Sequence, residues 1–305
     1  MKKRIMGFFL FVLLIISGCN KEKPLLVLPE PVTTSQVEVI TQEEATTTPP
    51  TEAVTEPIIP EINYEEIQPY EIGHIMVVMY HGIEEGRPPY QRAEIDFIKD
   101  LQYMYDHNYR LISMSDYKNG TIDIPAGMTP ILLTFDDGLN TTFALEEQDG
   151  QLVPKKGTAI ALLKDFCAAH PDFGTAASLY INGDHESFQG AGTLVQRLQW
   201  LDEEGYEIGN HTFSHPNLSK ISGDEVQEEI GKVDALIKSA LPNATVDVLT
   251  YPFGIRPDEA YRDLVLEGSY EGLGYHYALG FREGPSGPMV SALHINFDPY
   301  NCPRV

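Results

Sequence analysis

The sequence predicts an α/β fold in which repeated strand–helix units form a parallel sheet or barrel. Two observations carry this prediction. Short apolar runs alternate along the chain with amphipathic stretches of helical periodicity. About 235 residues remain once the N-terminal segments are set aside, and this length suits one large domain.

Several apolar runs have the composition of buried strands. These strands are expected at residues 75–80, 131–135 and 177–181, and from 206 onward. The acidic stretch around 146–150 interrupts the alternation and is expected to be an irregular insertion.

The amphipathic stretches between these runs predict helices, and two of them carry end signals. Gly205 is expected to end one helix in the left-handed conformation. Ser222, with Glu225 three residues later, forms the capping-box pattern that begins the clearest helix, and Pro242 ends it. The apolar positions expected to face inward are Ile95, Ile98, Leu101 and Tyr105; Ile160, Leu163 and Phe166; Leu194, Leu198 and Leu201; and Val226, Ile230, Val233, Leu236 and Ile237.

Residues 1–19 have the pattern of a bacterial lipoprotein signal. A basic start, residues 2–4, precedes an apolar run at 5–16 that is too short to span a membrane comfortably. Ile16-Ser17-Gly18-Cys19 resembles the lipobox, in which the Cys sulfur receives a diacylglyceryl group. This resemblance implies an extracytoplasmic protein anchored to the cell membrane through Cys19. The alternative is an ordinary cleaved signal peptide with an incidental Cys.

Residues 20–63 are rich in Thr, Pro and Glu, and the bias is strongest at 47–52. Such a composition cannot build a core, so this segment is expected to be a disordered tether. As a Pro-rich spacer it would reach from about 35 Å as a coil to about 120 Å if fully extended. The domain at 64–305 would then lie within reach of wall or matrix polymers.

The net charge limits the classes of molecule that the protein can bind, and the cysteine content limits its disulfides. The net charge of −24 argues against nucleic acid and other anionic polymers, whereas a neutral or cationic glycan is compatible. Besides Cys19 the chain contains Cys167 and Cys302. A buried free thiol is the expected state of Cys167, with a single disulfide as the alternative.

Thr134-Phe135-Asp136-Asp137-Gly138 places two carboxylates at the end of a predicted buried strand. An isolated Asp-Asp-Gly is usually a turn. At a strand end, however, neighbouring side chains point to different sides, so one Asp can bind a metal while the other addresses water.

His211-Thr212-Phe213-Ser214-His215 follows the strand that begins at 206. Two imidazoles four residues apart would lie on one face of a helical turn and could share one ion. Together with a carboxylate they suit zinc, with cobalt or nickel as alternatives, better than calcium or magnesium.

In combination these motifs resemble the polysaccharide deacetylase family, the NodB homology domain of carbohydrate esterase family 4. Met79-Tyr80-His81-Gly82 and the segment 205–210 also match, and the resemblance runs from about residue 75 to the C-terminus. It implies a distorted (β/α)7 barrel, a metal bound by Asp137, His211 and His215, and Asp136 as the general base.

The resemblance also assigns substrate-side roles. Tyr251-Pro252-Phe253-Gly254 is similar to the family segment that lines the substrate groove, where the N–H at Phe253 would hold the oxyanion. Thr250 stands where many members have an Arg that orients the base, so the residue that supports Asp136 is not identified.

The C-terminal region carries the remaining assignments. His294 is the candidate general acid, and a surface His without a catalytic role is the alternative. His81, at the end of the first strand, is expected to be structural, with a place at the rim of the site as the alternative. Residues 298–305 resemble the approach to the closing strand, so we expect a chain that stops short and leaves the end of the domain poorly sealed.

The implied function is metal-dependent N-deacetylation of a polysaccharide containing N-acetylglucosamine, such as peptidoglycan, poly-N-acetylglucosamine or a chitin-like polymer. Two alternatives stay open. One is a surface lipoprotein of the same fold that binds glycan without catalysis, and the other is an esterase that removes O-acetyl groups.

Overall fold

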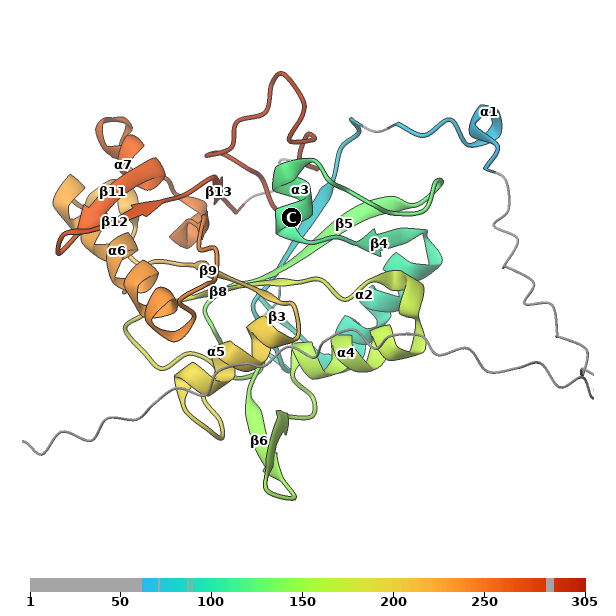
Figure 1. Cartoon of the computed structure of the whole chain (residues 1–305), viewed down its shortest axis with the longest axis horizontal. Helices are drawn as coiled ribbons and strands as arrows, with labels where there is room; N and C mark the ends of the chain where they lie inside the picture. Colours follow the sequence, from blue (N-terminus) through green and yellow to red (C-terminus); the bar gives the residue numbers. More distant parts are fainter. Residues whose placement is uncertain (1–61, 71, 87, 89, 284–287) are drawn as a thin grey trace, which may run out of the picture. The chain divides into compact units, whose positions relative to one another are not determined.

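The computed structural model describes residues 62–305 except 71, 87, 89 and 284–287 (Figure 1). The expected lipid-attachment residue Cys19, the signal at 1–19 and nearly all of the tether at 20–63 lie outside the described residues. Residues 60–305 form one compact unit. None of the helices in the described part of the chain combines the length and apolar character needed to cross a membrane.

A seven-stranded parallel sheet organises this unit. Its order is β1-β5-β8-β9-β10-β13, and β4 pairs with the beginning of β5. The predicted parallel α/β fold is therefore confirmed, and the expected strands at 75–80, 131–135, 177–181 and 206 onward correspond to β1, β5, β8 and β9. The seven strands are β1 (Met76–Tyr80), β4 (Tyr109–Leu111), β5 (Thr129–Phe135), β8 (Ser178–Ile181), β9 (Glu207–Asn210), β10 (Val248–Thr250) and β13 (Leu279–Phe281).

The last four residues close the sheet into a barrel. Cys302 exchanges hydrogen bonds with β13 through Gly280 and Arg282, at 3.0 and 2.9 Å. Val305 bonds to β1, donating to Val77 at 3.0 Å and accepting from Met79 at 2.8 Å. The expectation of a poorly sealed end was wrong, because 302–305 occupies the gap between the two edge strands.

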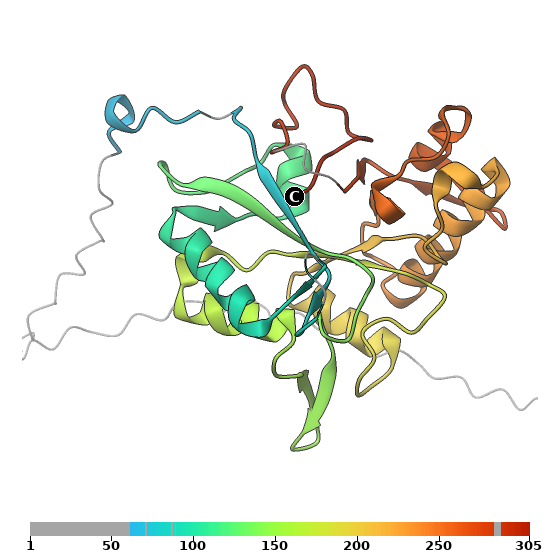
Figure 2. The same ribbon diagram turned by 180° about the vertical axis from the view of Figure 1, so that it is seen from behind.

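The helices cover the outer face of the strands. Figure 1 shows α2, α4 and α5 along one side of the sheet, and α6 grouped with β11, β12 and α7; Figure 2 shows β1 crossing beside β5 from behind. The helices are α1 (Tyr64–Ile67), α2 (Glu94–Asp106), α3 (Met114–Asn119), α4 (Ala159–Ala169), α5 (Leu194–Glu203), α6 (Gly223–Ala240) and α7 (Asp263–Leu266).

Helix α6 begins where the sequence predicts. Ser222 accepts a hydrogen bond from the Glu225 N–H, and the Glu225 carboxylate accepts one from the Ser222 N–H. Both unsatisfied groups at the helix start are thereby paired. Gly205 follows α5 with φ of +85°, as expected of a residue that ends a helix.

The inward face of α2 differs from the prediction. Ile95 and Ile98 are 57 % and 37 % exposed, whereas Phe97, Leu101 and Met104 are buried. The Phe97 ring packs edge-on against Tyr80 of β1 at 5.1 Å. This aromatic contact with the sheet sets the rotation of the helix, which apolar spacing alone did not reveal.

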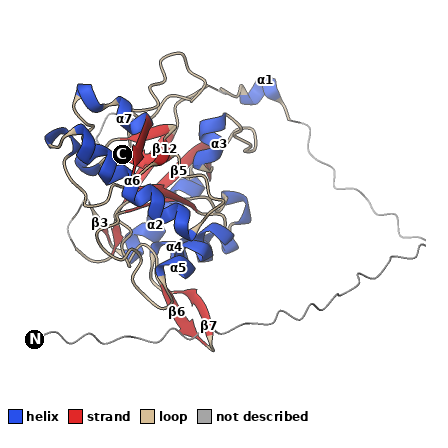
Figure 3. Cartoon of the chain, turned by 60° about the vertical axis from the view of Figure 1, so that its left-hand side comes forward, coloured by secondary structure: helices blue, strands red, loops and turns tan. Residues whose placement is uncertain are grey.

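The acidic segment at 146–150 is an ordered hairpin, so the expectation of an irregular insertion was wrong. Strands β6 (Leu145–Gln148) and β7 (Gln151–Pro154) pair antiparallel around Asp149 and Gly150, both with positive φ. Figure 3 shows this hairpin extending away from the helices. The other short strands are β2 (Gly82–Ile83) with β3 (Gln91–Arg92), and β11 (Glu267–Tyr270) with β12 (Leu273–His276).

The alternation of side chains along a strand determines which of them point into the barrel interior. Along β5, Ile131 and Leu133 join the core beneath the helices, whereas Leu132 joins a second cluster with Tyr180 and Phe281. Because side chains alternate along a strand, Asp136 follows Leu132 and Thr134 toward the same interior. The first carboxylate of the motif is therefore directed into the barrel.

Candidate active site

A cavity of about 650 Å³ opens at the carboxyl edge of the parallel strands. Side chains reach it from the ends of β1, β5 and β9, from the turn after β10 and from the C-terminal segment. This is the edge of an α/β barrel where binding and catalytic groups gather. Of the residues singled out in the sequence it contains Asp136, Asp137, His211, His215, Tyr251 and Phe253.

The two carboxylates leave β5 in different directions. Asp136 is 2 % exposed, and its N–H donates to the Tyr80 carbonyl at 3.0 Å. Asp137 has φ of +71°, which a non-glycine residue rarely adopts. This conformation turns the Asp137 carboxylate out of strand alternation and toward the histidines.

Arg304 is the partner of Asp136. Its Nη1 donates to Asp136 Oδ1 at 2.8 Å and its Nη2 to Oδ2 at 2.5 Å. Both side chains are buried, and Nη1 also reaches Thr134 Oγ1 at 3.2 Å. A bidentate guanidinium fixes the plane of a carboxylate, so Arg304 supplies the orientation for which the sequence offered no residue.

This ion pair controls the charge of Asp136. Burial alone would raise the pKa of the carboxyl, but the Arg304 guanidinium outweighs it and holds that pKa well below its usual range. Asp136 is therefore an anion at neutral pH although it is enclosed.

Thr250 orients the first histidine. The His211 Nδ1 lies 2.9 Å from the Thr250 carbonyl oxygen and 2.6 Å from its hydroxyl. With Nδ1–H donating to this carbonyl, Nε2 is free to act as a ligand. Nε2 lies 3.4 Å from Asp137 Oδ1.

The two histidines occupy a loop, not a helical turn as predicted. Residues 211–217 have no helical structure, and Thr212 and His215 have φ of +65° and +54°. Asn182 holds the loop by donating to the carbonyls of His211 and Thr212 at 2.7 and 3.1 Å. Left-handed residues thus bring His215 beside His211, with ring centroids 4.8 Å apart.

Asp137, His211 and His215 form a set of ligand atoms that fits a small divalent ion. These atoms all lie within 4.8 Å of one another, with Asp137 Oδ1 at 3.4 Å from His211 Nε2 and 3.7 Å from His215 Nε2. Tetrahedral zinc with bonds of 2.0–2.1 Å separates its ligands by about 3.3 Å. Asp137 is already close to this spacing from both histidines, whereas the two histidine nitrogens would have to approach each other to hold such an ion.

The charge states of Asp137 and His215 also suit a cation. Burial lowers the pKa of His215, and neighbouring His211 lowers it further, so the ring is neutral and able to bind metal. Burial would raise the pKa of Asp137, but its hydrogen bond with His211 keeps it below the usual value. For His211 the Asp136 and Asp137 carboxylates outweigh burial and raise its pKa.

The turn after β10 forms one wall. Phe253 has φ of +58°, its ring is 57 % exposed, and it meets His215 edge-on at 4.6 Å. Among the described residues the Phe253 N–H donates to no acceptor. Pro252 sets the turn, while Tyr251 is buried and donates to the Tyr300 carbonyl at 2.9 Å.

The cavity is also lined by a histidine for which a structural role was expected. His81 follows β1, lines the cavity, and packs edge-on against Tyr90 at 5.3 Å. It is near enough to lower the pKa of Asp136, Asp137 and His215 by its charge. The alternative in which His81 reaches the rim of the site is therefore the one that the structure contains.

His294 does not reach the cavity. It belongs to a turn in which its N–H donates to the Ser291 carbonyl at 2.9 Å and its Nδ1 accepts from the Asn296 N–H at 3.1 Å. The neighbouring Leu293 packs close to Gly120, just after α3. The expected general acid therefore lies away from Asp136 and the histidines.

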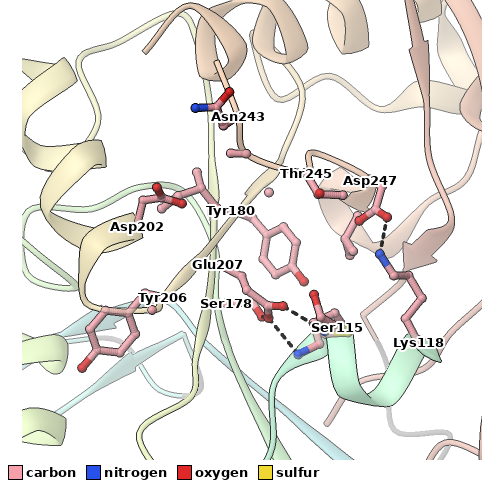
Figure 4. Close-up of a pocket in the computed structure, with 16 residues that line it drawn as sticks. Ser115, Lys118, Ser178, Tyr180, Asp202, Tyr206, Glu207, Asn243, Thr245 and Asp247 are labelled. Carbon is pink, nitrogen blue, oxygen red and sulfur yellow. Dashed lines mark hydrogen bonds and ion pairs between the residues drawn. The ribbon is translucent and has the colours of Figure 1, made fainter. Parts of the chain in front are cut away.

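A second cavity, of about 290 Å³, lies near the amino ends of β8, β9 and β10 (Figure 4). The Glu207 carboxylate there accepts from the Met114 and Ser115 N–H groups at 2.7 and 2.9 Å, and Lys118 pairs with Asp247. The Tyr180 ring separates this cavity from Arg304, 5.9 Å away. Since its principal charges are matched within the protein, we assign it no ligand.

Part of the chain is similar in sequence to known deacetylases. The family model described as Polysaccharide deacetylase matches residues 164–271. The chain is 27 % identical over 133 residues to a chitooligosaccharide deacetylase of Sinorhizobium fredii, covering 44 % of this chain and 51 % of that protein. It is 28 % identical over 156 residues to a peptidoglycan-N-acetylglucosamine deacetylase of Bacillus cereus, covering 47 % of this chain and 48 % of that protein. The matched regions thus span about half the length of these relatives.

Solved structures share the fold. The Streptococcus pyogenes deacetylase PplD in complex with acetate aligns with a TM-score of 0.56 at 20 % identity, over 77 % of this chain and 92 % of that one. The putative polysaccharide deacetylase BA0330 from Bacillus anthracis aligns with a TM-score of 0.54 at 20 % identity, over 77 % and 65 %. The chain is thus similar in sequence to polysaccharide deacetylases over part of its length, and it shares their fold.

Proposed function

We propose that this protein is a metal-dependent deacetylase that hydrolyses the acetamide of N-acetylglucosamine units in a polysaccharide. One observation carries the proposal: an anionic Asp136, fixed by Arg304, faces the same cavity as the ligand atoms of Asp137, His211 and His215. A base and a cation site side by side are what amide hydrolysis requires.

Asp137, His211 and His215 would hold the ion. Their mixed carboxylate and imidazole donors favour zinc, with cobalt or nickel as the alternatives. When bound, such an ion supplies a Lewis acid that polarises the acetamide carbonyl and makes water more acidic.

Asp136 acts as the general base. It accepts a proton from the attacking water, and the Arg304 guanidinium keeps its carboxylate ionised and correctly oriented for this transfer. Because Arg304 is itself buried and committed to Asp136, the base cannot rotate away between turnovers.

The Phe253 N–H is suited to stabilise the oxyanion. It has no acceptor within the described residues, and the positive φ of Phe253 points to a conformation maintained against strain. A donor of this kind contributes about 3 kcal/mol to transition-state stabilisation.

His81 replaces His294 as the proton donor to the departing amine. It lines the cavity, whereas His294 is held in a turn elsewhere. The C–N bond of the acetamide breaks, the acetyl carbon takes the water oxygen, and the nitrogen leaves with a proton from His81.

The substrate class follows from chemistry and from similar proteins. Relatives are named for chitooligosaccharide and for peptidoglycan N-acetylglucosamine, so a polymer containing this sugar is proposed here. The proposed location is the outer face of the bacterial cell membrane, with lipid on Cys19 and residues 20–63 as the tether.

Acetate release tests the proposal. The protein would be given N-acetylglucosamine oligomers, peptidoglycan and O-acetylated xylan, each with added zinc, with added cobalt and with a chelator. Metal-dependent acetate from the first two supports N-deacetylation. Release from xylan alone would favour the esterase, and binding to glycan without any release would favour a non-catalytic protein.

A further inference from the structure

Glu283 adds a negative charge to the rim of the cavity. It follows β13 and lies beside the turn at 252–254, because an added Cβ at Gly254 would approach the Glu283 N atom to 2.6 Å. Across the mouth, the Tyr90 hydroxyl donates to Glu283 Oε1 at 3.0 Å. Residues distant in sequence thus place this carboxylate between the Phe253 and His81 walls.

The other charges of the cavity have assigned partners. Arg304 neutralises Asp136, and Asp137 belongs to the ligand set of the proposed function. No lysine lines this cavity among the described residues. Arg304 is close enough for the charge of Glu283 to raise its pKa, but its guanidinium hydrogen bonds go to Asp136 and Thr134. Tyr90 is a neutral donor, and in the described part of the chain no cation forms a direct ion pair with Glu283.

We propose that Glu283 binds the ammonium group of a glucosamine unit adjacent to the N-acetylglucosamine unit being hydrolysed. This inference rests on the proposed function and defines its substrate as a partly deacetylated chain. Hydrolysis of the acetamide C–N bond releases acetate and leaves an amine that takes up a proton. Each turnover therefore creates the cation that Glu283 attracts, so deacetylated units should form next to one another.

The charge of the neighbouring sugar distinguishes binding of an ammonium group by Glu283 from simple hydrogen bonding. A carboxylate that only accepts from a neutral sugar hydroxyl would favour acetylated and deacetylated neighbours alike. A carboxylate that binds an ammonium favours the deacetylated neighbour, and the preference weakens with salt because the site is open to solvent.

The experiment uses chitin tetramers of defined pattern: one fully acetylated, and two with a single glucosamine on one or the other side of the reacting unit. The ratio of kcat/KM between the partly and fully acetylated tetramers is measured for wild type, Glu283→Gln and the control Glu203→Gln. Glu203 is an exposed carboxylate at the end of α5, outside the cavity.

Wild type and the control should prefer one of the partly deacetylated tetramers, and Glu283→Gln should lower that ratio by about 5-fold, as expected for a partly exposed ion pair. An unchanged ratio, or an equal loss on all tetramers, would overturn the inference. Dissociation constants provide a second measurement without turnover, comparing Asp136→Asn with the double variant that adds Glu283→Gln. If no tetramer is hydrolysed, the proposed function fails on this substrate, while a charge preference lost in the double variant would still support Glu283.

Discussion

Arg304 and Asp136 form a buried bidentate ion pair across 168 positions of sequence, with hydrogen bonds of 2.8 and 2.5 Å. The same C-terminal segment that closes the barrel between β13 and β1 therefore also orients the proposed base. Closure of the fold and preparation of the site depend on one short stretch of chain.

Replacing Arg304 by Lys should reduce kcat by about 10- to 100-fold, the usual effect of losing a group that orients a catalytic residue. Lysine keeps the charge but cannot make two parallel hydrogen bonds to the carboxylate. Acetate release and bound zinc are both measured. Arg282→Lys is the matched control, because Arg282 lies just after β13 and its side chain donates, among the described residues, only to the Asn301 carbonyl, at 3.5 Å. Equal activity in the Arg304 and Arg282 variants would refute the orienting role.

His81→Asn should lower kcat by about 10²- to 10⁴-fold, the range for loss of a general acid, with zinc content unchanged. His294→Asn should leave kcat near the wild-type value, because His294 lies outside the cavity. Steady-state kinetics on the two variants checks this. The reverse pattern would restore His294 as the acid.

Asp172→Asn should destabilise the protein at neutral pH. Asp172 pairs with the buried Arg110 at 2.7 Å and accepts from the Tyr105 hydroxyl at 3.0 Å. The hydrogen bond from Tyr105, together with Arg110, lowers the pKa of Asp172 in the folded state.

The sign of the pH effect follows from this lowered pKa. The stabilisation is present above the unfolded pKa of about 3.9 and disappears as pH falls through the lower folded value. Thermal unfolding is measured from pH 7 to pH 2. The difference in melting temperature between wild type and variant should shrink as the pH falls. Asp165→Asn, on the exposed side of α4, serves as the control. A difference in melting temperature that stays constant with pH would contradict the ion-pair explanation.

Gly209→Ala should destabilise the barrel by about 1–3 kcal/mol, as overpacking does. A Cβ at Gly209 would lie 2.4 Å from the Tyr180 ring, which is fully enclosed below Arg304. Gly274→Ala should be tolerated, because the added Cβ would lie 3.9 Å from the Gly268 carbonyl oxygen, an ordinary van der Waals contact. Denaturant unfolding gives the free energy of unfolding of each variant. Similar values for the two would show that the Tyr180 ring leaves room for a Cβ at Gly209.

Local signals allowed much of the fold to be predicted. The strand runs, the capping box at Ser222 and the stop at Gly205 depend on residues near one another, and the structure contains each of them. The rotation of α2 was missed because it depends on a contact between Phe97 and Tyr80 of another element.

In the site, too, the features set by residues near one another in sequence were predicted, and those set by distant contacts were not. The carboxylates and histidines belong to short motifs, so their proximity in one cavity could be anticipated. The loop geometry around His215 depends on left-handed residues such as Thr212, which composition does not reveal. Arg304 was missed because its role exists only after barrel closure, and nothing near it in sequence indicates a carboxylate partner.

The central claim is that Asp136 performs base catalysis beside an ion held by Asp137, His211 and His215. The most direct test measures acetate release and bound zinc in wild type, Asp136→Asn and Asp137→Asn. We predict that Asp136→Asn keeps zinc but releases no acetate, and that Asp137→Asn loses both. Full acetate release by Asp136→Asn, or release by wild type that persists after zinc is removed, would contradict the account.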